Sequence, residues 1–135
     1  MARDDPHGVI TLACNGTIDQ LLRRAVTQIE ALGLDVYAVI DHSGDAAEAG
    51  IALPETKLVL FGSAKELTAL VLAYPHIGIE LPLKLLICQS DGGRVLISYL
   101  APEDLAHRYG LTEDETDALR VVDTIARQTR NSGNG

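Results

Sequence analysis

The pattern of apolar and polar positions divides the chain into five short β-rich segments and five segments with helical spacing. In the second β-rich segment, Val36, Ala38 and Ile40 alternate with their neighbours, as expected for a strand. Between the last two segments, Asp91-Gly92-Gly93 is typical of a hairpin turn, so these strands are expected to pair. The predicted strands cover residues 8–14, 34–40, 57–61, 83–89 and 94–100.

Local signals mark the ends of the predicted helices. Thr17 with Gln20 and Thr112 with Glu115 have the spacing of a capping box, in which each side chain bonds the backbone of the other residue. Ser63 is expected to cap a third helix, with Glu66 at the matching position. The predicted helices cover residues 17–32, 64–74, 102–109 and 112–130, and a short helix covers residues 45–49, capped by Ser43 or Asp41.

These elements predict a single α+β domain with a mainly antiparallel sheet packed on helices, in the order β-α-β-(short α)-β-α-β-β-α-α. The domain covers residues 1–135, with loose tails at 1–7 and 131–135. The last helix carries an apolar stripe that must cover its own sheet or a partner's sheet, and we expect it to stabilise a homodimer. The stripe consists of Leu119, Val122, Ile125 and Ala126.

Charge and composition narrow the possible functions. The 11 basic and 19 acidic residues give a net charge of -8, which argues against binding to nucleic acid or to an anionic membrane. No apolar run is long enough to span a bilayer, and the polar N-terminus does not resemble a secretory signal. Cys14 and Cys88 lie in separate apolar segments and are expected to be buried, reduced thiols. These features predict a soluble, cytoplasmic protein.

Asp41 and His42 are candidate catalytic residues because they lie at a strand end beside a helix start. The alternative is structural, with Asp41 capping the short helix and His42 fixing the turn, and this interpretation is favoured. A metal site needs convergent ligands, whereas neighbouring residues of a strand point to opposite faces. We therefore expect no metal and no cofactor.

Gly62, Ser63, Lys65 and Thr68 form the candidate ligand-binding site. A strand that passes through Gly-Ser into a helix presents free backbone N–H groups, which suit a small anion. The spacing differs from that of a P-loop, and simple helix capping by Ser63 is the favoured alternative. Further along, Glu80 precedes Leu-Pro-Leu-Lys and could pair with Lys84 in a structural role.

The middle of the chain resembles the domain-of-unknown-function family 302. The resemblance rests on VIDHSGDAAEAG at 39–50, LVLFGSAKELTALVLAYP at 58–75, GIELPLKLLI at 78–87 and the strand end Ser98-Tyr99. It covers residues 8–105 and depends on the order and spacing of these segments. It implies a fold like that of the TATA-binding protein, usually in a homodimer, and it implies no particular activity.

Three functions remain open. The leading hypothesis is a non-catalytic homodimeric module that binds a small, anionic ligand near Gly62 and Ser63 or has a regulatory role. The second is an enzyme in which Asp41 and His42 act as an acid-base pair while Ser63 and Lys65 orient an anionic substrate. The third is a structural protein-interaction domain.

Overall fold

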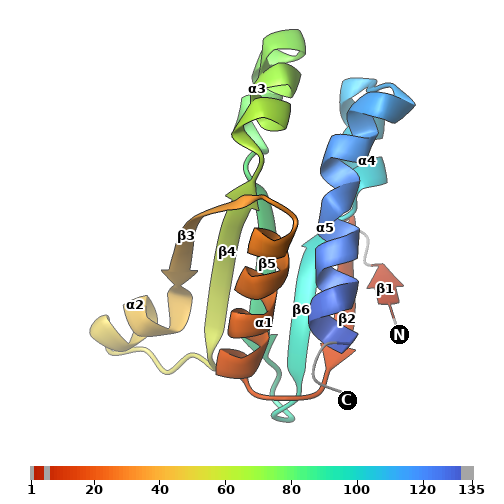
Figure 1. Cartoon of the computed structure of the whole chain (residues 1–135). Coiled ribbons are helices and arrows are strands. Elements are labelled where there is room, and N and C mark those ends of the chain that lie inside the picture. The colour runs from red at the N-terminus through yellow and green to blue at the C-terminus, as the bar shows by residue number, and fades with distance from the viewer. Residues whose placement is uncertain (1, 5–6, 132–135) are drawn as a thin grey trace.

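Six strands of the chain form one antiparallel sheet in the order β1-β2-β6-β5-β4-β3 (Figure 1). The computed structural model describes residues 2–4 and 7–131 of the chain. The last two predicted strands pair across the predicted hairpin, with Gln89 opposite Val95. The strands are β1 (Ala2–Asp4), β2 (Val9–Cys14), β3 (Asp35–Asp41), β4 (Thr56–Gly62), β5 (Leu83–Gln89) and β6 (Val95–Leu100).

Helices α1 and α5 lie side by side on one face of the sheet, and α3 extends beyond the end of the strands (Figure 1). α5 packs against α1 and against β2, β5 and β6. The predicted α+β class and the predicted order of elements are confirmed. The helices are α1 (Ile18–Ala31), α2 (His42–Glu48), α3 (Ala64–Ala73), a 3₁₀ helix η1 (Pro75–Ile79), α4 (Pro102–Tyr109) and α5 (Glu113–Asn131).

Every second residue of the central strands enters an aliphatic core between the sheet and the helices. Val59, Leu85, Ile87 and Ile97 have no exposed surface, and the single Phe of the chain, Phe61, is buried with them. The helices contribute complementary positions at helical spacing. These are Leu21, Ala25 and Ile29 of α1 and Leu119, Val122, Ile125 and Ala126 of α5.

The predicted capping residues hold the starts of the helices. The Thr17 hydroxyl accepts from the Gln20 N–H at 3.1 Å, and the Gln20 side chain accepts from the Thr17 N–H at 2.9 Å. Thr112 and Glu115 form the same reciprocal pair at 3.1 and 2.9 Å. Ser63 accepts from the Glu66 N–H at 3.3 Å. Short-range sequence signals therefore locate three of the helix starts.

Two predicted features differ from the structure. Residues 2–4 are predicted to lie in a loose tail, but they form β1, which pairs with β2. This pairing is made by the backbone, so it does not require a pattern of apolar residues that the sequence would show. Residues 1, 5–6 and 132–135 of the two predicted tails lie outside the described residues, while Asn131 ends α5. The short helix α2 begins at His42 rather than at residue 45, because Asp41 is its N-cap.

The apolar stripe of α5 is buried within its own chain. Leu119, Val122, Ile125 and Ala126 are at most 3% exposed and belong to the main core. The stripe therefore covers the sheet of the same molecule and leaves nothing for a partner to cover. The stripe thus gives no reason to expect a partner at α5, and the homodimer stays a prediction.

Candidate functional site

Asp41 has a structural role at the end of β3. Its carboxylate accepts from the Gly44 N–H at 2.9 Å and from the Ser43 hydroxyl at 2.7 Å, and it lies 3.4 Å from Lys57 Nζ. These interactions lower the pKa of Asp41, chiefly through the Gly44 N–H. His42 is exposed, and its side chain forms no hydrogen bond or ion pair with any of the described residues. The geometry is that of a capped turn.

The two predicted sites lie at opposite ends of the β3–β4 ladder. Asp41 pairs with Lys57, whereas Gly62 pairs with Asp35. The two pairs are six positions apart along β3 and five along β4, which is about 17 to 20 Å at about 3.3 Å per residue. Asp41 and His42 therefore do not reach Ser63 or Lys65. The arrangement required by the enzymatic alternative is absent from this structure.

Gly62 and Ser63 are shaped by packing and capping at the start of α3. A Cβ atom on Gly62 would lie only 2.4 Å from Leu67 Cδ1, so glycine permits the close approach of strand and helix. Lys65 and Thr68 are exposed. Of the four predicted ligand-binding residues, Thr68 alone lines the neighbouring pocket of about 530 Å³. That pocket is formed mainly by Tyr37, Leu60, Ala64, Leu67, Val71, Gly78, Leu81 and Pro82.

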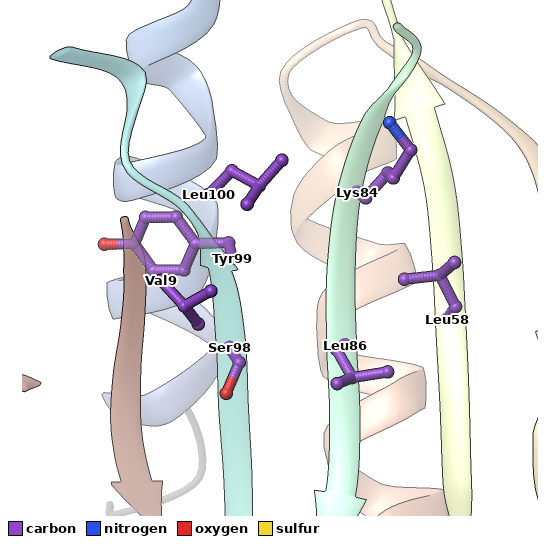
Figure 2. Close-up of a pocket in the computed structure, with 7 residues that line it drawn as sticks. All are labelled: Val9, Leu58, Lys84, Leu86, Ser98, Tyr99 and Leu100. Carbon is purple, nitrogen blue, oxygen red and sulfur yellow. The ribbon is translucent and has the colours of Figure 1, made fainter. Parts of the chain in front are cut away.

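The sheet face opposite α1 and α5, which we call the open face, was not singled out from the sequence. No described helix covers its centre (Figures 1 and 2). Cross-strand partners such as Leu58–Leu86 and Leu86–Ser98 alternate with the buried core positions. By this register, the open face consists of Val9, Thr11, Ala13, Ala38, Ile40, Thr56, Leu58, Leu60, Lys84, Leu86, Cys88, Leu96, Ser98 and Leu100.

The sequence contains a signal for this face. An antiparallel strand with one face in water alternates apolar and polar residues, whereas a strand covered on both faces is apolar at consecutive positions. The segments LVLF at 58–61, LLIC at 85–88 and VLI at 95–97 are of the second kind. The strands therefore have the composition of strands covered on both sides, while the described chain covers only one side.

The polar groups of the open face are almost all neutral. Thr11 Oγ1 and Ser98 Oγ lie 2.9 Å apart and bond with each other. Cys88 is a free thiol whose pKa is raised by burial, as is that of Cys14 in the core. Within β2 to β6, Lys84 is the single charged residue at these positions, and the register also places Arg3 of β1 opposite Thr11. Such a surface is suited to apolar contact rather than to catalysis.

A pocket of about 250 Å³ hollows the open face (Figure 2). It lies where β5 and β6 diverge, beyond their last pair at Leu86 and Ser98. Figure 2 shows the lining residues on the strands, with the helices behind, and the Tyr99 side chain among them turns to the helix side, where its hydroxyl bonds Asp123 of α5. The lining residues are Val9, Leu58, Lys84, Leu86, Ser98, Tyr99 and Leu100.

The Lys84 ammonium at the end of this pocket is held by backbone carbonyl groups. It donates to the Glu80 carbonyl at 2.6 Å and to the Pro82 carbonyl at 3.2 Å, and partial burial lowers the pKa of Lys84. The Glu80 carboxylate is instead bonded by Arg108 at 2.9 Å and by the Tyr109 hydroxyl at 3.1 Å. The expected Glu80–Lys84 pair thus forms through the main chain of Glu80.

Comparison with known families decides the family of the chain. The model of the family "Domain of unknown function DUF302" matches residues 10–129. The chain belongs to this family. A solved structure described as an uncharacterized conserved DUF302 protein from Bacillus stearothermophilus has the same fold, with a TM-score of 0.76 at 14% identity. The match covers 92% of this chain and 96% of that chain.

Curated relatives extend beyond the DUF302 domain seen here. The chain is 28% identical over 124 residues to proteins named fluoride-specific ion channel FluC 1, from Brucella suis and Brucella abortus. The match covers 92% of this chain but 49% and 46% of the two relatives, so the chain spans about half their length. Within residues 2–4 and 7–131, no helix is long and apolar enough to cross a membrane. The same residues contain no group of three potential metal ligands.

Proposed function

We propose that this DUF302 chain is a non-catalytic, homodimeric binding module in which the open faces of two copies pack together. The observation that carries the proposal is the composition of β4, β5 and β6, which are apolar on both sides although the chain covers one side. A second copy would bury this surface by a two-fold, self-complementary contact, the commonest arrangement of soluble oligomers.

The size of the open face supports this proposal. Five strands about 4.8 Å apart and six residues of about 3.3 Å each give a face of about 20 by 20 Å. Its flat projection of about 400 Å² lies within the range of the largest patches found on monomers, which are often functional. The leucine side chains project from this plane, so the accessible area of the face is larger than its flat projection. A contact of this size belongs with the small interfaces of weak, transient complexes, so we expect a dimer that dissociates on dilution.

The catalytic alternative has no comparable support, because its four residues lie at two ends of a strand pair. A small ligand near Thr68 or in the open-face pocket remains part of the proposal, as does a cytoplasmic location, which the two free cysteines support. The Brucella relatives, which are named as channels, are about twice as long as the matched region. They support the proposal that this domain can form one part of a larger protein.

Light scattering over a concentration series tests the dimer. We expect a mass near twice the 14.4 kDa of one chain, falling towards 14.4 kDa on dilution. Leu86→Asp places a charge at the centre of the open face and should raise the dissociation constant by at least about tenfold. Leu72→Asp is the matched control because Leu72 is 84% exposed on α3. A wild-type mass of one chain at all concentrations, or equal effects of the two substitutions, would refute the proposal.

A further inference from the structure

The pocket on the open face combines an apolar lining with one cation. Leu86 and Leu100 lie on either side of the gap between β5 and β6, and Leu58 lies on β4 beside β5 (Figure 2). Lys84 is the single charged residue of the lining, and its alkyl stem lies along the pocket wall. A ligand that fills this space must therefore have an aliphatic body, and a negative group at one end would complement the ammonium.

No carboxylate of the described residues forms a hydrogen bond or ion pair with the Lys84 ammonium. Its two hydrogen-bond acceptors are the uncharged carbonyl oxygens of Glu80 and Pro82, and none of the ion pairs among the described residues includes it. An ammonium has three N–H donors, so one remains for a further acceptor. Burial lowers the pKa of Lys84, and the Glu80 carboxylate offsets this in part through space without forming an ion pair. The hydrogen bonds of that carboxylate go to Arg108 and Tyr109.

We propose that this pocket binds a small aliphatic carboxylate, with the carboxylate at Lys84 and the alkyl chain between Leu58, Leu86 and Leu100. A volume of about 250 Å³ corresponds to about eight water molecules at about 30 Å³ each, which suits a chain of six to eight carbons. The inference rests on the proposed function in one respect, since packing of a second open face would close the pocket and exclude water.

Binding of octanoate, measured by calorimetry on the full chain, tests the ligand class. We expect octanoate to bind and 1-octanol, which has the same chain length without the charge, to bind about tenfold more weakly. Lys84→Met keeps the alkyl stem but removes the charge, and it should weaken octanoate binding by about tenfold or more without changing 1-octanol binding. Lys84→Arg should retain the preference for octanoate, and Lys65→Met on exposed α3 is the matched control.

The mass of each sample, measured in parallel, separates this inference from the dimer proposal. A dimer that does not bind octanoate, or that binds octanoate and 1-octanol equally, would overturn the ligand and leave the dimer intact. Unchanged octanoate binding by Lys84→Met would also overturn it. Binding that depends on Lys84 in a protein with the mass of one chain would support the ligand and refute the dimer.

Discussion

The stripe of α5 offers the sharpest test of how this fold is stabilised. Ile125 has no exposed surface and belongs to the core formed by α5, α1 and the sheet. Replacing a buried isoleucine by alanine removes three carbon atoms and leaves a cavity, which typically costs 2 to 5 kcal/mol, or about 3 kcal/mol for a core that partly relaxes. Ile125→Ala should therefore lower the free energy of unfolding by about 3 kcal/mol.

Thermal and urea unfolding, followed by circular dichroism at one protein concentration, measure this loss. At about 4 °C per kcal/mol for a domain of this length, the melting temperature should fall by about 12 °C. Thr124→Ala is the matched control, because the neighbouring Thr124 is exposed and its substitution should change stability by less than about 0.5 kcal/mol. Light scattering should show the wild-type mass for the folded Ile125→Ala protein.

The outcome distinguishes an internal stripe from an interface. If Ile125→Ala melted within about 2 °C of the Thr124→Ala control, Ile125 would not be enclosed in the core of one chain. If it halved the mass while each chain stayed folded, α5 would be the dimer contact and the open face would lose its role. A stability loss at constant mass would confirm the packing of α5 against its own sheet.

Other substitutions test separate parts of the structure. Gly62→Ala should cost about 1 to 3 kcal/mol in urea unfolding, because its Cβ would meet Leu67, whereas Gly92→Ala has open space and should be nearly neutral. Asp41→Ala should lower the melting temperature at neutral pH. Since the pKa of Asp41 is lowered from 3.8 in the folded state, its stabilisation is complete above that value and is lost as the pH falls through the folded pKa. The difference between Asp41→Ala and wild type should therefore shrink in acid, and a difference independent of pH would contradict this role of the carboxylate.

The elements of this fold follow from the sequence because their determinants are local. Thr17 and Gln20 bond each other across one helical turn, so three residues of sequence are enough to locate the start of α1. The start of α5 is determined in the same way by Thr112 and Glu115, and the apolar stripe of α5 follows from helical spacing alone. In contrast, β1 depends on pairing with the edge of β2, where Arg3 lies opposite Thr11, 8 residues later, and its own sequence carries no strand pattern.

The candidate sites depended on distances that the sequence does not contain. Asp41 and Ser63 are close to strand ends, but only the antiparallel register of β3 and β4 places those ends far apart. Lys84 looked like a partner for the Glu80 side chain, and the structure connects it to the Glu80 backbone instead. The strands β4, β5 and β6 are apolar at consecutive positions, which the sequence already contains. Only the arrangement of the helices shows that one of the two apolar faces is uncovered.

The distribution of charge gives an independent reason to regard the open face as a contact surface. The chain has 30 charged residues and a net charge of -8, so its water-exposed surfaces are rich in carboxylates. An antiparallel sheet with one face in water would be expected to place polar and charged residues on that face. Here the positions of the open face in β2 to β6 hold leucines at the centre, a neutral Thr11–Ser98 pair and one charged residue, Lys84. Two such faces can pack without bringing carboxylates together.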